Sequence, residues 1–152
     1  MRDGQVSLWD LRQFKSKCPI STADHHRSVL SVEFSPISGN YLATTCFNDF
    51  IGILSCDLTH LKIENKIKHN MNTGRWLKHF VTRFIPGRDD AIMIGSMLWP
   101  RQVSVLNLEG TLLHKFVDEE LQSVLSIVAM HPHMPMFAGI NSSGKTYLFE
   151  SS

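Results

Sequence analysis

Apolar residues in this chain of 152 residues occur in short runs that are rich in β-branched and aromatic side chains. Turn-forming residues separate the runs, as at Ser38-Gly39-Asn40, Asn48-Asp49 and Glu109-Gly110. Runs of this kind are typical of β-strands, and no segment keeps the 3.6-residue period of a helix. The pattern therefore predicts an all-β protein, with strands at residues 5–10, near 20, 29–34, 41–46, 51–56, 63–67, 77–84, 91–96, 102–108, 112–117, 124–130, 136–140 and 146–149.

One of these strand sequences occurs twice. Ser28-Val29-Leu30-Ser31-Val32 recurs 95 residues later as Ser123-Val124-Leu125-Ser126-Ile127, and each copy runs on to a proline, Pro36 or Pro132. Between them a third apolar run ends at Pro86, so that the prolines are 50 and 46 residues apart. Short strands that repeat with a period in the forties are typical of the blades of a β-propeller.

Composition and charge exclude some classes of function without selecting one. The formal net charge is +1, so a nucleic-acid or membrane partner would have to be recognised by a local patch. No apolar run approaches the ~18 residues that span a bilayer, and the N-terminus lacks the apolar core of a signal peptide. Cys18, Cys46 and Cys56 have no metal-site spacing, which predicts buried free thiols in a reducing compartment, the cytosol or the nucleus.

Two motifs narrow the propeller prediction to a family. Val6-Ser7-Leu8-Trp9-Asp10 carries the Trp-Asp pair that ends the third strand of a WD repeat, and His26 lies where such a repeat often has the histidine that opens the next blade. Together with the segments at 69–77, 95–101 and 141–145, these motifs give a chain that resembles, over nearly its whole length, the WD-repeat propellers related to DNA damage-binding protein 2. The resemblance implies a nuclear protein that binds DNA and can serve as substrate receptor for a cullin-4 ubiquitin ligase.

The resemblance also implies a division into blades. WD-repeat rings commonly close by borrowing the last blade's outer strand from the N-terminus, so we expect the C-terminal part of a seven-bladed ring, about three and a half blades. Residues 1–24 would end one blade, 25–68 and 69–120 would form two more, and 121–152 would form the last blade without its outer strand. Because an open set of blades leaves faces unburied, we expect the isolated chain to be marginally stable.

Trp9, Asp10 and Arg12 belong to a WDxR pattern. In propellers that dock on the damage-binding adaptor of cullin-4 ligases, this pattern presents its arginine at one rim of the ring, so the resemblance implies that Arg12 contacts the adaptor. A guanidinium suits such an interface because it pairs bidentately with carboxylates and stacks on apolar surface. The alternative is that Trp9 and Asp10 serve only the framework of the blade.

A second candidate surface is expected at the opposite rim. Connections between blades share this rim with the loops between second and third strands, which would bring together Lys68, Asn70, Arg75, Trp76, Arg101 and Lys145, with Trp99 among them. Cations neutralise phosphates and aromatic side chains stack on bases, so we expect DNA or chromatin to bind here. The alternative is that Trp76 and Trp99 pack between blades and the cations are only solvated.

The loop at 69–76 departs from the damage-binding relative, which has an aromatic-polar wedge there. Its tip reads Asn72-Thr73-Gly74-Arg75 in this chain. The departure favours contact with the DNA backbone or a groove over flipping of a damaged base.

Residues 139–146 match the nucleotide-binding pattern GxxxxGK followed by Thr. A phosphate-binding loop needs a helix that begins at the lysine, whereas the residues after Lys145 predict a strand. We therefore interpret Ser142-Ser143-Gly144 as a tight turn and expect no nucleotide.

The histidines show no spacing of metal ligands, and His26 is expected to form a hydrogen bond within the blade framework. No arrangement of nucleophile, base or paired carboxylates predicts an enzyme. The expected protein is a binding platform without metal or cofactor, located in the nucleus with a cytoplasmic pool as the alternative. Its expected partners are the cullin-4 adaptor and DNA or chromatin, with no membrane; a WD-repeat scaffold that binds only proteins is the alternative function.

Overall fold

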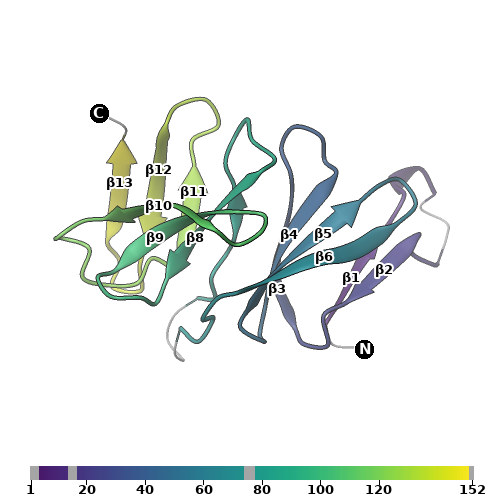
Figure 1. Cartoon of the computed structure of the whole chain (residues 1–152), viewed down its shortest axis with the longest axis horizontal. Helices are drawn as coiled ribbons and strands as arrows, with labels where there is room; N and C mark the ends of the chain where they lie inside the picture. The colour runs from purple at the N-terminus through teal and green to yellow at the C-terminus, as the bar shows by residue number, and fades with distance from the viewer. Residues whose placement is uncertain (1–3, 14–16, 74–77, 151–152) are drawn as a thin grey trace.

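The computed structural model describes residues 4–13, 17–73 and 78–150. Within these ranges it has thirteen β-strands, one short 3-10 helix, η1 (Leu11–Gln13), and no α-helix, which confirms the all-β prediction (Figure 1). Several apolar runs form strands at the predicted residues, among them β3 (Val29–Phe34), β4 (Tyr41–Cys46) and β8 (Ala91–Ser96). No helix in the described part of the chain is long and apolar enough to cross a membrane.

The strands form four antiparallel sheets that succeed one another along the chain. The first sheet contains β1 (Gln5–Leu8) and β2 (Ser21–Asp24), and the second contains β3, β4, β5 (Phe50–Cys56) and β6 (Leu61–Lys68). The third contains β7 (Arg83–Phe84), β8, β9 (Gln102–Asn107) and β10 (Leu112–Val117). The fourth contains β11 (Ile127–Met130), β12 (Met136–Ile140) and β13 (Thr146–Glu150).

Each sheet is a meander in which strands lie in chain order, the arrangement of a propeller blade. This architecture is a partial β-propeller, as predicted. The division into blades at residues 24, 68 and 120 stays a prediction.

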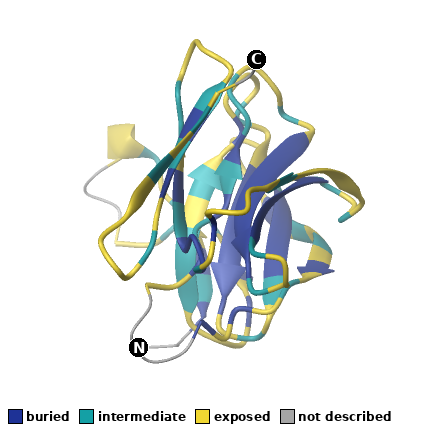
Figure 2. Cartoon of the chain, turned by 90° about the vertical axis from the view of Figure 1, so that its left-hand side faces the viewer, coloured by how far each residue is buried: buried dark blue, intermediate teal, exposed yellow. Residues whose placement is uncertain are grey.

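Three hydrophobic clusters hold the sheets together, one at each junction between neighbours. Adjacent residues on a strand point to opposite faces of the sheet, so one strand supplies two junctions. In β4, Leu42 packs toward the first sheet and Ala43 toward the third. In β8, Ile92 belongs to the cluster shared with the second sheet and Met93 to the cluster shared with the fourth. Figure 2 shows the resulting pattern, with buried strands inside and exposed loops and outer strands.

Some predicted strands are shorter in the structure, three of them by two residues or more. The run at 77–84 pairs with β8 only at β7, because the carbonyl oxygen of Phe80 accepts a hydrogen bond from Thr45 Oγ1 and Val81 N donates to Ser126 O. The run at 124–130 becomes a strand only at Ile127, because the carbonyl oxygen of Ser126 accepts the hydrogen bond from Val81 N. The first strand ends at Leu8 instead of Asp10, where the chain turns into η1.

Antiparallel order places the loops on two opposite edges. One edge carries the β1–β2 connection and the loops 35–40, 57–60, 85–90 and 131–135; we call it the Arg12 rim, and it lies along the top of Figure 1. The other carries the loops 47–49, 97–101 and 141–145 and the connections between sheets; we call it the Arg101 rim, and it lies along the bottom.

Candidate functional site

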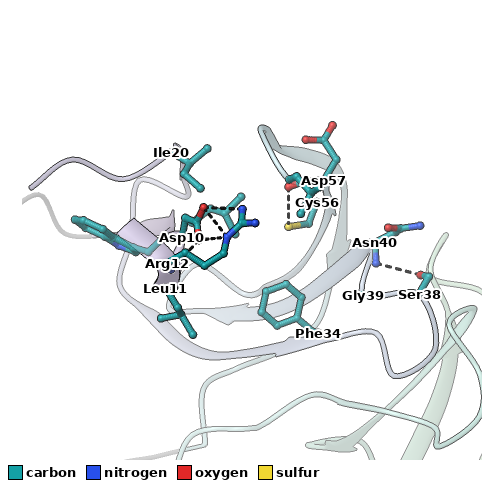
Figure 3. Close-up of a pocket in the computed structure, with 13 residues that line it drawn as sticks. Asp10, Leu11, Arg12, Ile20, Phe34, Ser38, Gly39, Asn40, Cys56 and Asp57 are labelled. Atoms are coloured by element: carbon teal, nitrogen blue, oxygen red, sulfur yellow. Dashed lines mark hydrogen bonds and ion pairs between the residues drawn. The ribbon is translucent and has the colours of Figure 1, made fainter. Parts of the chain in front are cut away.

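A groove of about 530 Å³ opens on the Arg12 rim, and the WDxR residues form one of its walls (Figure 3). Its other walls are the end of β3 with the loop 38–40, and the end of β5 with residues 57–58. Much of the lining is apolar and open to solvent: Trp9, Leu11, Ile20, Phe34 and Leu58. Three segments far apart in sequence therefore contribute exposed apolar side chains to one concave surface.

Arg12 stands at the edge of this groove with 85% of its side chain exposed. Its Nε and Nη2 atoms donate to Asp10 Oδ1 and Oδ2 at 3.0 and 2.8 Å, a bidentate ion pair. The backbone N–H of Arg12 also donates to Asp10 Oδ1, at 2.9 Å, and Gln13 N donates to Asp10 O. These bonds turn the chain sharply after β1, so Asp10 both shapes the turn and holds the arginine outward.

The ion pair keeps both groups charged. Hydrogen bonds from the Arg12 side chain and backbone hold the pKa of the Asp10 carboxyl below its usual value, and the same contact raises the pKa of Arg12. The sequence prediction had the guanidinium fork open to a partner's carboxylate. In the structure Asp10 occupies the fork, so a partner meets the free edge and the flat face of the guanidinium.

Trp9 lies beside the pair and is half exposed, while the Asp10 side chain is largely covered. An indole that only served the blade framework would be buried, and this one lines the groove instead. The other apolar residues of the groove, Ile20, Phe34 and Leu58, carry no motif. Sequence reasoning missed them because only the packing of the first sheet on the second makes them neighbours.

A second exposed arginine on the same rim provides a natural comparison. Arg88 Nε and Nη2 donate to Asp90 at 2.8 and 2.7 Å, again two residues apart and bidentate. Neither residue lines the groove. Between them, Asp89 accepts hydrogen bonds from the backbone N–H groups of Ile37 and Ser38, which ties the 85–90 loop to the 35–40 loop.

On the Arg101 rim, the structure places Lys68 at the end of β6 and Asn70 just after it, both exposed. Between them, His69 donates through Nε2 to the carbonyl oxygen of Gly95 at 2.9 Å, which fastens this segment to the end of β8. The Asn70 Oδ1 atom accepts a hydrogen bond from Asn72 N and stabilises the following turn. Arg75 and Trp76, predicted to bind DNA, lie outside the described residues.

Arg101 is half-buried, whereas the alternative to DNA binding had it as a merely solvated cation. Its Nη1 donates to Met97 O at 2.7 Å, and its Nε is buried with no hydrogen-bond partner among the described residues. Less of the guanidinium is thus available to a phosphate than the sequence prediction assumed. Its carbon Cζ lies 5.6 Å from the ring centre of Trp99. Trp99 itself is 75% exposed, so the alternative that it packs between blades is wrong.

Lys145 is exposed on the same rim, in the last sheet, beside Glu120, Gln122 and Tyr147. Its backbone N–H donates to Asn141 Oδ1, which also accepts from Ser143, so residues 141–145 form the predicted tight turn. β13 begins immediately after Lys145. A strand at this position leaves no helix N-terminus to face a phosphate, which argues against the nucleotide-binding reading.

The framework histidine is His25, and the prediction for His26 is wrong. The His25 ring is 2% exposed and its Nε2 lies 3.4 Å from Thr44 Oγ1, which in turn donates to Gly52 O. His26 is exposed with a positive φ, and its backbone N–H donates to Asp24. Burial lowers the pKa of His25 and of His69 and so favours the neutral form of both rings.

Two of the three cysteines are buried as predicted, Cys46 and Cys56, and burial raises the pKa of both thiols. Cys18 is exposed, contrary to the prediction, because it lies on the β1–β2 connection. In the described part of the chain, no cluster of three histidine, cysteine or acidic side chains is arranged to hold a metal ion.

Comparison with solved structures shows the fold. The β-propeller domain of Cps50 (Swd1) from Myceliophteria thermophila superposes with a TM-score of 0.73 at 14% identity, covering 99% of this chain and 48% of that domain. Raptor from Chaetomium thermophilum gives a TM-score of 0.70 at 16% identity, covering 99% of this chain and 13% of Raptor. No protein-family model matches the chain.

Sequence comparison finds relatives in two groups of proteins. WD repeat-containing protein 76 of Xenopus laevis is 40% identical over 96% of this chain, and its mouse (Mus musculus) counterpart is 38% identical over 95%. DNA damage-binding protein CMR1 of Scheffersomyces stipitis is 26% identical over 97% of this chain. The chain spans 26%, 24% and 32% of the lengths of these relatives. With the propeller sheets and the WDxR turn, these identities show that the chain belongs to the WD-repeat family that contains WD repeat-containing protein 76.

Proposed function

We propose that this protein is a nuclear, DNA- or chromatin-associated binding platform that docks on the damage-binding adaptor of cullin-4 ubiquitin ligases and acts by binding, not by catalysis. The fungal relatives are named DNA damage-binding proteins, which supports the DNA-associated half of the proposal. A WD-repeat propeller supplies rigid rims for partners, which supports the platform half.

The observation that carries the adaptor contact is the presentation of Arg12. A side chain with 85% exposure would ordinarily sample many rotamers, and ordering it on binding costs free energy. The bidentate bond to Asp10 restricts the guanidinium before any partner arrives. An arginine with a flat face beside exposed apolar side chains is typical of the residues that dominate protein–protein interfaces.

The observation that supports DNA contact is that the cations of the opposite rim are not neutralised by ion pairs. Lys68, Arg101 and Lys145 form no side-chain ion pair with another described residue. Unpaired cations attract phosphates and release counterions when they bind them. Lys68, Asn70 and Lys145 are the exposed contacts that we assign to the DNA backbone, together with Arg75 and Trp76 of the same connection.

Capture of the adaptor tests the first contact. The tagged full-length protein would be expressed in its own cells as the parent, as Arg12→Ala and as Arg88→Ala, and the co-purified adaptor measured. Arg12→Ala should lose most of the adaptor, on the order of tenfold or more, because a central interface arginine is removed. Arg88→Ala removes a matched ion pair on the same rim outside the groove and should capture like the parent.

Equal capture by all three proteins would contradict the Arg12 contact and leave WDxR as part of the blade framework. No capture by the parent would favour the alternative function, a WD-repeat scaffold that binds other proteins. A steep fall of DNA affinity with salt would support the second contact, and no DNA binding at low salt would refute it.

A further inference from the structure

We infer that Trp99 is a stacking platform for an unpaired base of a nucleic acid, and that Arg101 positions it. This inference rests on the proposed DNA association and adds to it the kind of DNA that the Arg101 rim prefers. The sequence analysis expected aromatic side chains of this rim to stack on bases in general, and the inference assigns that contact to Trp99 and to an unpaired base.

The first argument is exposure. Trp99 is 75% exposed and the adjacent Leu98 is 63% exposed, at the tip of the 97–101 loop. Large apolar side chains in adjacent positions on a loop tip are costly to leave in water, and such exposure is typical of binding surfaces. The indole points away from the cores between the sheets, since neither Trp99 nor Leu98 belongs to any of the three hydrophobic clusters.

The second argument is rigidity. Met97 packs against the hydrophobic cluster between the second and third sheets and anchors the start of the loop. Leu98 N donates to Ser96 Oγ at 3.1 Å, and Arg101 Nη1 donates back across the loop to Met97 O at 2.7 Å. A loop tied at both ends presents its tip in one conformation, so little entropy is lost when a ligand stacks on it.

The third argument is charge. The Arg101 guanidinium lies 5.6 Å from the Trp99 ring centre, within the range of a cation–π interaction. Arg101 therefore braces the indole and places a positive charge beside it. Lys68 adds another cation on this rim, on a segment that His69 fastens to Gly95, one residue before the loop's Ser96 anchor. An aromatic face with one cation beside it and another on the same rim suits a base whose own phosphates lie close by.

These features favour an unpaired base over a protein side chain or an intact duplex. A base in a duplex is already stacked on both faces and offers an indole no surface, whereas a base in a single strand or a bulge offers a complete face. A protein side chain would use the exposed indole alone, whereas a base brings its own phosphates to the cations of this rim. Single-stranded DNA and RNA share the stacking chemistry, so the experiment includes both.

The test measures the affinity of the full-length protein for a fluorescent oligothymidine, an oligouridine of equal length and a perfect duplex. Loss of one stacked base should weaken single-strand binding of Trp99→Ala about tenfold and leave duplex binding within about twofold. Trp99→Phe keeps a ring and should lie between parent and Trp99→Ala. Oligothymidine should quench tryptophan emission in the parent and much less in Trp99→Phe.

Arg101→Lys tests positioning, because it keeps the charge and loses the planar fork that holds Met97 O. It should weaken single-strand binding while the slope of affinity against salt stays that of the parent. A change in slope without a change in quenching would mean that Arg101 holds a phosphate and would overturn its positioning role.

The stacking role would be overturned if Trp99→Ala bound all three nucleic acids with the parent's affinity, or if its affinity for all three fell by the same factor. The DNA association of the parent would stand in either case. No binding of any nucleic acid by the parent would overturn both proposals. Tighter parent binding to oligouridine than to oligothymidine would identify RNA as the source of the base. Loss of a protein partner from Trp99→Ala, with nucleic-acid binding intact, would overturn the inference in favour of a protein-binding rim.

Discussion

The two rims of this partial propeller carry arginines in opposite electrostatic settings. On the Arg12 rim, Arg12 pairs with Asp10 and Arg88 with Asp90, both bidentately and both at short range. On the Arg101 rim, Arg101 turns its donor to a backbone carbonyl. Lys68 and Lys145 form no ion pair with another described residue.

The difference matters because a charge beside its counterion has a weak field at a distance. The paired arginines offer shape, a flat face and a restrained geometry at contact range, and Arg12 does so at the edge of an apolar groove. The unpaired cations offer attraction over a Debye length, about 10 Å at 0.1 M salt. One rim is therefore suited to a protein surface and the other to a polyanion.

The largest expected effect separates the rims by damaging one of them. A Cβ at Gly95 would clash with the carbonyl oxygen of Leu125, a backbone atom of the 118–126 connection that leads into the next sheet. Gly95→Ala should therefore destabilise the full-length protein by about 3 kcal/mol or more in chemical denaturation. Binding of nucleic acid should fail before adaptor capture does, since Gly95 lies under the 97–101 loop.

Gly87→Ala is the matched control on the Arg12 rim. Gly87 has a φ of 75° but nothing lies within 4 Å of an added Cβ. Gly87→Ala should lower the free energy of unfolding by about 1 kcal/mol, the strain of a non-glycine residue in the left-handed conformation. Equal destabilisation by the two variants would contradict the close approach of the sheets at Gly95.

A smaller effect should distinguish the rims by their response to salt. Removing Lys68 and Lys145 together should weaken DNA binding about tenfold at low salt and lower the slope of log affinity against log salt by about two, one for each phosphate contact. Adaptor capture should not change, and its own salt dependence should be shallow because Arg12 is already paired. A double variant with the parent's slope would show that these lysines do not touch phosphates.

Acid should loosen the Arg101 rim first. Burial lowers the pKa of His25 and His69 in the folded state, so as the pH falls below their ordinary value of 6.5 the unfolded chain takes up protons that the folded chain does not. Stability is therefore retained above that pH and declines below it. Hydrogen exchange of the full-length protein at pH 7 and pH 5 should show faster exchange around these residues than in the 35–40 loop. His69→Gln should reduce the difference there, and an unchanged profile would contradict the burial argument.

The smallest effect concerns the restraint on Arg12. Asp10→Asn keeps the size of the side chain but removes the charge that holds the guanidinium. Adaptor capture should fall about threefold, because Arg12 stays and only its preorganisation is lost. Lowering the ionic strength should partly restore capture of the variant, since its freed arginine keeps a full charge. Complete loss of capture would mean that Asp10 itself contacts the adaptor.

Much of the fold could be predicted from local patterns. Turn-forming residues such as Gly110, whose φ is positive, marked the turns in the sequence. The strands that these turns join into hairpins could then be predicted as well. The predictions failed where backbone groups bond across sheets, as at Phe80, Val81 and Ser126, since strand propensity at those residues says nothing about a partner more than thirty positions away.

The candidate sites divide in the same way. WDxR identified Arg12 because the motif is contiguous and Asp10 acts on its near neighbour. The groove around it could not be predicted, because Ile20, Phe34 and Leu58 meet only when the first two sheets pack. The framework role was predicted for His26 and belongs to its neighbour His25. Adjacent residues of an extended chain face opposite sides, and the sequence of two consecutive histidines does not show which of them faces the core.

The sequence by itself determined the strands, the turns, the repeat and the family, because these depend on side-chain size, polarity and order over short stretches of chain. Only the tertiary structure decided which charges are paired, which tryptophan is exposed and where a groove forms. Those properties depend on contacts between sheets, and a pairwise contact across a junction leaves no periodic trace in the order of residues along either strand.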